Sequence, residues 1–237
     1  MEYQQFNNII TRYGLSPISC QQFDNFVKYY RYLIEENSKY NLTAIVDEEE
    51  VFIKHFLDSI LSSNLIKDNS TVIDIGCGAG FPSIPLKIIN PTIHLTLCDA
   101  VNKKVEFVNK LSTKVLELSN VTPIHARCED LAKNPKYREK YDFAVSRAVA
   151  PLNILLEYLI PFIKVGGKCI IYKGKNADVE IENAISAIKL LNCELADRIH
   201  YHIDEIDSDR EILIFNKVKP TDNNYPRQNN KIRKNPL

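Results

Sequence analysis

Some residue types are rare or absent in this sequence, and so are the segments that are typical of membrane and secreted proteins. It has no tryptophan, one methionine and only seven glycines in 237 residues. No apolar run approaches the roughly 18 residues that a membrane-spanning helix needs, and residues 1–5 lack the basic and apolar segments of a secretory signal. Thirty basic residues balance thirty acidic ones, so no net charge draws the chain to nucleic acid or to a membrane. These absences predict a soluble, cytoplasmic protein without membrane contact.

Cysteine usage argues against a disulfide framework and against a zinc site. The six cysteines are scattered, no two have the spacing C-x-x-C, and several fall in expected strands, where they act as small apolar residues. Such a pattern is typical of a reducing compartment, and we expect no bound metal. The cysteines are Cys20, Cys77, Cys98, Cys128, Cys169 and Cys193.

The N-terminal quarter of the chain is expected to be helical. Apolar side chains such as Phe23, Phe26 and Tyr30 recur at three- and four-residue steps, which predicts one apolar stripe along a helix. Asp47 followed by Glu50 is a capping pair that predicts the start of a second helix. We expect an irregular connection between the two helices, and we expect both to pack against the segments that follow.

From residue 71 onward, strand-like and helix-like segments alternate. This alternation predicts a parallel sheet that is covered by helices on both faces. The last two strands are joined by a short acidic turn, so they should pair antiparallel. The expected strands are 71–75, 94–98, 121–125, 142–146, 168–172, 196–203 and 210–216. The expected helices are 83–89, 103–118, a short one near residue 130, 152–163 and 179–191.

A glycine-rich turn between the first strand and the next helix is the most informative segment. Glycines at Gly76, Gly78 and Gly80 let the backbone approach a ligand closely, and the following helix offers free N–H groups. A dinucleotide fingerprint would also need glycine at position 81, which is Phe81. With Asp74 ahead of the glycines, the segment instead resembles motif I of class I methyltransferases that use S-adenosylmethionine (SAM). Two alternatives remain open for this turn: it could bind another nucleotide, or it could have a purely structural role.

The ends of the next two strands carry further candidate cofactor contacts. Ligands in such sheets bind outside the carboxyl ends of the strands. The second strand ends at Asp99, whose carboxylate can accept both hydroxyls of a ribose, although a helix-capping role is also open. After the third strand, Glu129 or a backbone amide can reach the amino edge of an adenine, and Cys128 can pack on the ring. The alternative there is a surface turn with helix-capping acids.

Basic residues follow the fourth and fifth strands. Arg147 stands between small apolar residues and can grip the methionine carboxylate of SAM or a phosphate of the substrate. The Gly166–Gly167 turn is expected to introduce the fifth strand, which leads to Lys173 and Lys175 beside the same crevice. We regard Arg147 and these two lysines as candidates for positioning the substrate.

The C-terminal tail differs in composition from the rest of the chain. Residues 216–237 hold six basic residues against one acidic residue, and prolines and asparagines fill most of the remainder. The simplest interpretation is a solvated, poorly ordered terminus. The functional interpretation is an arm that contacts phosphates on a protein that is otherwise neutral.

Strings along nearly the whole chain resemble one family, the bacterial 16S rRNA guanine-N7 methyltransferases, also called glucose-inhibited division protein B. The strings at 40–45 and 54–60 make the resemblance specific, because methyltransferases in general do not share them. Further matching strings lie at 74–85, 146–150, 173–175, 225–227 and 235–237. The resemblance implies cofactor contacts at Gly76, Phe81, Cys128, Glu129 and Arg147.

The resemblance also implies an architecture. We expect the class I methyltransferase (Rossmann-like) α/β fold, with a mostly parallel seven-stranded sheet that ends in an antiparallel hairpin. Residues 1–65 should form a helical extension packed on the core, 66–218 the SAM-binding domain, and 219–237 the basic tail.

The activity implied by the resemblance is methyl transfer from SAM to N7 of one guanine in 16S ribosomal RNA, free or in the small subunit. We expect the protein to be a monomer. Guanine N7 has a lone pair and no proton, so its attack on a sulfonium needs no general base. We accordingly assign no catalytic acid or base, and expect His55 and His125 to pack or hydrogen-bond. Two alternatives stay open: a SAM methyltransferase of small molecules, and a non-catalytic RNA-binding factor for ribosome assembly.

Overall fold

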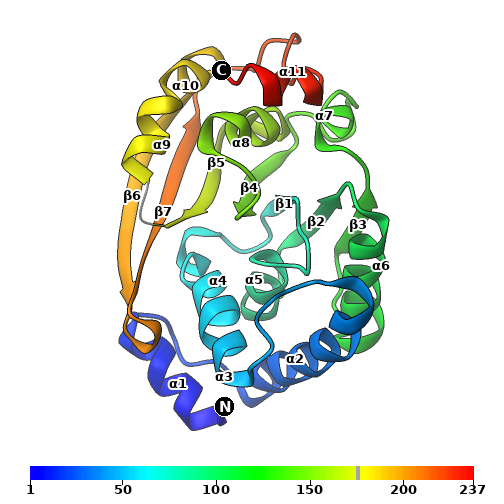
Figure 1. The fold of residues 1–237 in the computed structure, drawn as a ribbon, viewed down its shortest axis with the longest axis vertical. Helices are drawn as coiled ribbons and strands as arrows, with labels where there is room; N and C mark the ends of the chain where they lie inside the picture. Colours follow the sequence, from blue (N-terminus) through cyan, green and yellow to red (C-terminus); the bar gives the residue numbers. More distant parts are fainter. Residues whose placement is uncertain (175–176) are drawn as a thin grey trace.

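In the computed structural model, which describes residues 1–174 and 177–237, the chain forms a seven-stranded sheet between two layers of helices (Figure 1). The strand order is β3-β2-β1-β4-β5-β7-β6. Strands β1 to β5 pair in parallel, and β7 runs antiparallel to both β5 and β6. The strands are β1 (Thr71–Ile75), β2 (His94–Asp99), β3 (Val121–His125), β4 (Tyr141–Arg147), β5 (Ile163–Lys173), β6 (Cys193–Ile203) and β7 (Ser208–Lys217).

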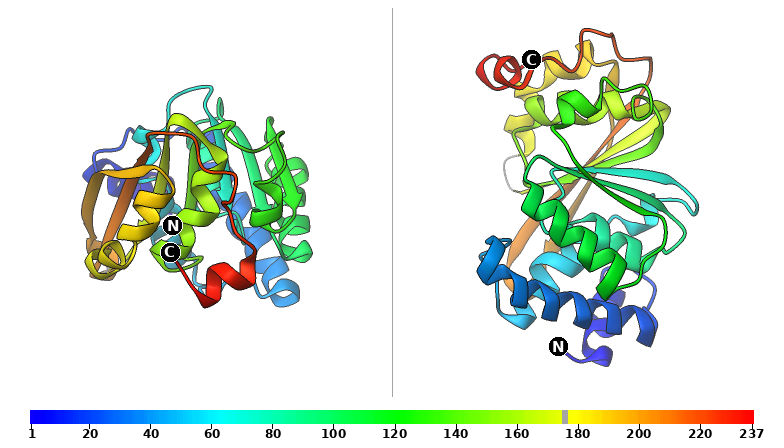
Figure 2. Two further views of the ribbon diagram at one scale, coloured as in Figure 1. Left: turned by 90° about the horizontal axis from the view of Figure 1, so that it is seen from above. Right: turned by 90° about the vertical axis from the view of Figure 1, so that its right-hand side faces the viewer.

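Helices cover both faces because residues along each strand alternate between the two faces. In β1, Val72 belongs to the apolar core on one face and Ile73 to the core on the other. The first core is closed by α1 (Tyr3–Arg12), α2 (Cys20–Tyr40), α3 (Glu48–Val51), α4 (Asp58–Ile60), α5 (Ser83–Ile89) and α6 (Asn102–Lys110). The second is closed by α7 (Cys128–Leu131), α8 (Leu152–Leu159), α9 (Ala177–Asn183), α10 (Ile185–Leu190) and α11 (Asn229–Lys234). Figure 2 shows these layers edge-on.

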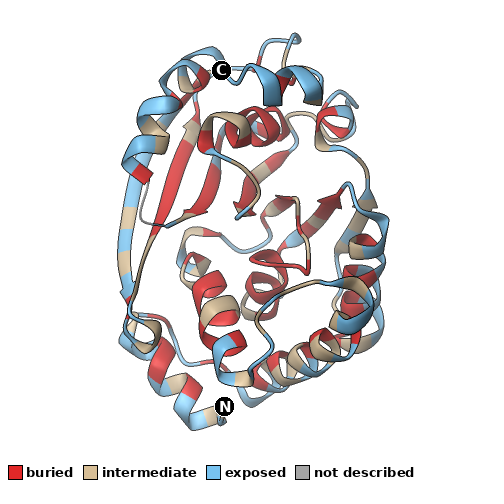
Figure 3. Ribbon diagram, in the orientation of Figure 1, coloured by how far each residue is buried: buried red, intermediate tan, exposed pale blue. Residues whose placement is uncertain are grey.

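The α3–α4 pair is one continuous helix through a π-helical segment, Phe52–Leu57, and α8 (Leu152–Leu159) is extended by a 3₁₀ turn, Ile160–Phe162. The expected cap is confirmed, because the Asp47 carboxylate accepts a 3.0 Å hydrogen bond from the Glu50 backbone N–H. Figure 3 shows buried residues along the strands and on the sides of the helices that face them. Among the described residues, no helix is long and apolar enough to cross a membrane.

Three details of the expected secondary structure are wrong. The helix expected over 152–163 ends earlier, since β5 already begins at Ile163. The helix expected over 179–191 is two helices, α9 and α10. Gly166 and Gly167 do not precede the fifth strand but lie at an irregularity inside it. Ile163 and then Lys168 of β5 pair with β4, and the register shifts between these two residues. A Cβ on Gly167 would lie 2.7 Å from the Asp142 carbonyl oxygen, so the strand needs glycine at this irregularity.

The C-terminal tail is an ordered strap that packs on the second layer of helices. The Arg138 guanidinium donates to the backbone carbonyls of Thr221 and Tyr225, at 2.8 Å each. The Arg227 guanidinium makes two parallel contacts with the fully buried Glu157 carboxylate, at 2.6 and 2.9 Å. The strap ends in α11, whose Ile232 is buried in the core beneath it. Two of the six basic tail residues, Arg227 and Lys217, therefore serve internal ion pairs.

Candidate functional site

A cavity of about 470 Å³ lies outside the carboxyl ends of β1 to β4. The strand order reverses between β1 and β4, and crevices at such a reversal are where open α/β sheets bind ligands. The loop after β1 forms the floor of the cavity. Groups from the ends of β2 and β3 line one side, and groups from β4 and from the α2–α4 region line the other. Four consecutive strand ends thus converge on one space.

The glycine-rich loop adopts a conformation that side chains disfavour. Gly76, Gly78 and Gly80 have φ values of +73°, +56° and +98°, in the left-handed region. Gly76 has a second constraint, because a Cβ there would lie 2.7 Å from a methyl carbon of Val149. Gly78 has open space around it, with nothing nearer than 3.9 Å. All three positions therefore favour glycine because of their backbone conformation. Gly76 also needs it because the loop after β4 passes close by.

Asp74 and Gly80 support this loop from behind and do not line the cavity. Asp74 is fully buried, and one of its oxygens accepts a hydrogen bond from the Ser83 hydroxyl. Burial, with the nearby Asp99 as a smaller contribution, raises the pKa of Asp74 to about 7. Its other oxygen, Oδ1, has no hydrogen-bond partner among the described residues. The Tyr29 hydroxyl of α2 donates to the Ala79 carbonyl at 2.5 Å, so the N-terminal helices also hold the loop.

Asp99 lines the cavity and organises its floor. Its carboxylate accepts hydrogen bonds from the Gly78 N–H at 3.0 Å and from the Val101 N–H at 2.8 Å. The position of Asp99 is therefore compatible with both roles expected from the sequence. It caps the start of α6, and it lines the cavity, where it could contact a ribose.

Cys128 and Glu129 line the same side of the cavity, at the start of α7. The Cys128 thiol lies 3.4 Å from a carboxylate oxygen of Glu129. Burial, together with this carboxylate, raises the pKa of the Cys128 thiol well above its usual range. Cys128 is therefore a neutral, weakly polar surface and not a nucleophile.

Arg147 joins the β4 end to the α3–α4 helix. Its guanidinium donates to the Asp58 carboxylate at 2.6 Å and to the Lys54 carbonyl at 3.1 Å. A second guanidinium nitrogen donates to Nδ1 of His55 at 3.1 Å. Its carbon Cζ lies 5.1 Å from the centre of the Phe81 ring, and the His55 ring stacks on the same ring with 4.5 Å between centres.

Of the two candidate lysines, the structure describes only Lys173. Lys173 donates to the Glu180 carboxylate at 2.6 Å and to the Ala150 carbonyl at 3.0 Å, and it does not line the cavity. It therefore ties α9 to the loop after β4. Lys175 lies outside the described residues.

Several residues line the cavity although the sequence patterns did not indicate them as contacts of a ligand. Thr43 and His55 lie in the strings that carry the family resemblance, which is the only sequence signal for them. Lys104 reaches the cavity from α6, and Tyr158 from α8. Asn229 and Arg233 of α11 complete the wall near Tyr158, whose hydroxyl bonds to the Asn229 side chain at 2.8 Å. The tail thus contributes to the cavity, which no local pattern indicates.

Comparisons with known proteins agree with this architecture. A family model described as rRNA small subunit methyltransferase G matches residues 22–211. A ribosomal RNA small subunit methyltransferase G from Caldanaerobacter subterraneus subsp. tengcongensis is 48% identical over 216 residues, which cover 90% of each chain. One of the same name from Streptococcus pneumoniae is 40% identical, and the alignment covers 100% of both chains. A solved SAM-dependent methyltransferase from Aquifex aeolicus matches with a TM-score of 0.53 and 18% identity, covering 73% of this chain and 94% of its own, so it shares the fold.

Proposed function

Since the chain belongs to the family of rRNA small subunit methyltransferase G, we propose that it transfers the methyl group of SAM to N7 of one guanine in small-subunit ribosomal RNA. The observation that carries this proposal is the convergence of the glycine-rich loop, Asp99, Glu129 and Arg147 on one cavity. A ribosomal substrate also favours a cytoplasmic location. We retain the division into a helical extension, a SAM-binding domain and a basic tail as part of the proposal.

The cavity suits SAM in size and in polarity. Its volume of about 470 Å³ falls in the usual range for small-molecule pockets, roughly 300–1,000 Å³. Asp99 would hold the ribose hydroxyls, and the Cys128 thiol, which is neutral, would face the adenine together with Glu129. Beneath the loop, Oδ1 of the buried Asp74 has no hydrogen-bond partner among the described residues, and a cationic ligand in the cavity would stabilise the ionised form of this carboxylate. When bound, SAM supplies a methyl group on a positively charged sulfur.

The residues near the β4 end favour methyl acceptors that need no base. Nδ1 of His55 already accepts a hydrogen bond from Arg147, so its lone pair is occupied. Burial, with the neighbouring Arg147 charge, lowers the pKa of His55 to about 3, which keeps the ring neutral at pH 7. His55 therefore does not accept a proton from a substrate. An acceptor such as guanine N7 carries no proton to remove, and catalysis then depends on alignment and exclusion of water.

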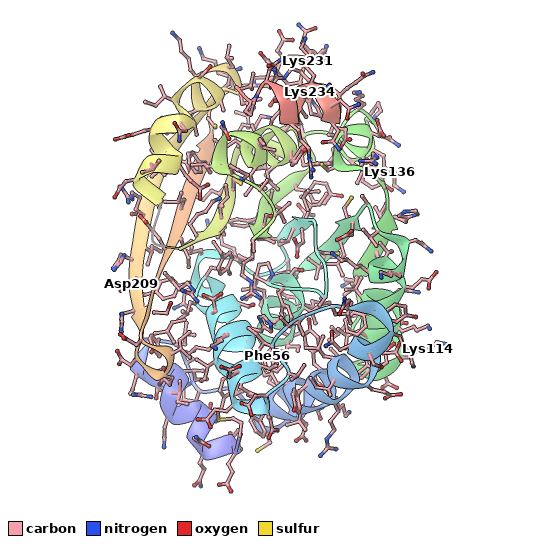
Figure 4. All side chains as sticks on the ribbon, viewed as in Figure 1. Phe56, Lys114, Lys136, Asp209, Lys231 and Lys234 are labelled. Atoms are coloured by element: carbon pink, nitrogen blue, oxygen red, sulfur yellow. The ribbon has the colours of Figure 1, made fainter. Side chains whose placement is uncertain are left out.

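The rim of the cavity offers a place for the RNA backbone. Figure 4 marks Lys231 and Lys234 on α11 and Lys136 on the neighbouring segment, at the same end of the molecule. Arg127 and Arg233 line both the cavity and an adjoining depression of the surface. Exposed cations at fixed positions bind phosphates without reading sequence, so we assign this rim to the RNA backbone.

The test is a transfer assay with SAM labelled in its methyl group. Purified protein is incubated with 16S rRNA or with small ribosomal subunits from cells that lack the gene. We expect label in one N7-methylguanine, which chemical cleavage at that base locates. Label in a small molecule only would favour the small-molecule methyltransferase, and SAM binding without transfer to any ribosomal RNA would favour the non-catalytic assembly factor.

A further inference from the structure

Thr43 occupies a fixed position on the wall of the cavity, in the connection between α2 and α3. The side chain of Asn37, in the last turns of α2, holds this connection. Its amide oxygen accepts from the backbone N–H groups of Leu42 and Thr43 at 2.8 and 3.0 Å, and its amide nitrogen donates to the Thr43 carbonyl at 3.0 Å. The Thr43 side chain therefore has little freedom to move relative to the cavity.

The directions of the hydrogen bonds around Thr43 follow from the tautomer assigned to His55. A guanidinium can only donate, so the contact from Arg147 makes Nδ1 of His55 an acceptor. The neutral ring then carries its hydrogen on Nε2 and donates it to the Thr43 hydroxyl oxygen, 2.9 Å away. The backbone N–H of Ile45 donates to the same oxygen at 3.0 Å.

These two donors occupy both lone pairs of the Thr43 hydroxyl. Its own O–H must therefore donate, and no acceptor for it is found among residues 1–174 and 177–237. The Asp58 carboxylate holds the Arg147 guanidinium in place, with 2.6 Å between the two charged groups. Arg147 therefore stays positioned as the donor to His55, and His55 as the donor to Thr43. The result is a hydroxyl that can act only as a donor on the cavity wall.

Two oxygen acceptors could meet this hydroxyl: the methionine carboxylate of SAM and the carbonyl of the target base. Asp99 and Cys128 line the side of the cavity assigned to the ribose and adenine, whereas Thr43, with Phe81 and His55, lines the side next to the β4 end. On that side the half-buried His55 ring stacks on the buried Phe81, and a wall that contains an aromatic ring suits a planar base.

Resting on the proposed function, we propose that Thr43 determines specificity for guanine by donating a hydrogen bond to its O6. In guanine, O6 is an acceptor next to N7, whereas adenine has an amino group, a donor, at the same place. A threonine free to reorient would accept from that amino group. Because both lone pairs of Thr43 are occupied, an adenine amino group would meet a second donor and find no acceptor.

The test measures the coupling between the Thr43 hydroxyl and O6 of the target. The substrate is the small-subunit RNA, with its target guanine located by the mapping above, or the same RNA with 2-aminopurine at that position, which keeps N7 but lacks O6. The proteins are wild type, Thr43→Val, Thr43→Ser and, as a matched control, Thr113→Val, whose hydroxyl bonds to the Asn109 carbonyl away from the cavity. kcat/KM and the Kd for SAM are measured for each.

We expect Thr43→Val to lower kcat/KM on the guanine substrate by about fivefold to tenfold, the usual effect of losing one hydrogen bond. On 2-aminopurine the same variant should match wild type within about twofold. Thr43→Ser and Thr113→Val should behave as wild type, and every variant should bind SAM with unchanged Kd.

Three results would overturn the inference. An equal loss on both substrates would show a structural role for Thr43, since the effect would not depend on O6. A Kd for SAM that rises by the same factor as kcat/KM falls would assign the hydroxyl to the methionine carboxylate. An unchanged kcat/KM in Thr43→Val would show that the Thr43 hydroxyl makes no hydrogen bond to the target base. If wild type methylates no small-subunit RNA, the proposed function fails first and this inference with it.

Discussion

Replacing Gly76 by alanine should impair SAM binding more than folding. The new Cβ would lie 2.7 Å from a methyl carbon of Val149, closer than a normal contact. Val149 is only half-buried and lines the cavity, so its side chain yields by moving into the space that SAM needs. The backbone strain at a φ of +73° adds about 1 kcal/mol to the loss of stability. Calorimetric titration should then show a Kd for SAM that is higher by at least about tenfold, or roughly 1.4 kcal/mol.

Two controls separate the contributions to this effect. Gly14→Ala has nearly the same φ, +74°, with nothing within 4 Å of its Cβ, so it should lose about 1 kcal/mol of stability and keep normal SAM binding. Val149→Ala removes the obstructing methyl carbons, and in the Gly76→Ala background it should restore the Kd for SAM to within about threefold of the Val149→Ala single variant. Stability is measured by urea unfolding.

Either of two results would contradict the role assigned to Gly76. Wild-type affinity for SAM in Gly76→Ala would mean that the loop does not form the floor of the SAM site. Failure of Val149→Ala to restore binding would mean that the close approach of the two loops is not the cause of the loss.

Three further predictions follow from the same geometry. Arg147→Ala removes the nearest cation from the buried Asp58 carboxylate, which keeps the Tyr201 hydroxyl at 2.9 Å and a guanidinium nitrogen of Arg210 at 3.8 Å. Urea unfolding should therefore show a loss of about 2 kcal/mol, and methyl transfer should fall at least about tenfold; full activity would exclude a role for Arg147 in methyl transfer. Because the pKa of His55 is lowered to about 3, the unfolded state binds more protons between that value and about 6.5, and stability falls as pH falls through this range. At pH 5 the loss should be about 2 kcal/mol relative to pH 7, and His55→Gln should be less stable at pH 7 yet flatter with pH; equal slopes would contradict the assignment. Changing the three basic residues of α11 to glutamine should lower the salt dependence of RNA binding by about two units of slope, measured by filter binding at several salt concentrations, and an identical slope would exclude the helix from the RNA contact.

Local sequence patterns predicted most of the strands and helices because those patterns reflect local geometry. The β1 strand and α5 begin and end at the residues that the sequence indicates. The errors lie where a tertiary contact overrides the pattern. At Gly167, crowding by the Asp142 carbonyl produces an irregularity inside β5, although a glycine pair by itself indicates a turn.

Local sequence patterns alone specify the sheet, the glycine-rich loop and the strand ends that surround the cavity. They can do so because parallel strands bring their carboxyl ends to one edge, whatever packs around them. Which polar groups remain available to a ligand depends on contacts that form only in the folded chain. Lys173 is engaged by Glu180, Arg147 by Asp58, and the Thr43 hydroxyl is left as a donor. Such partners come from separate elements, and hydrogen-bond direction depends on every contact in the series, so no local pattern in the chain can specify them.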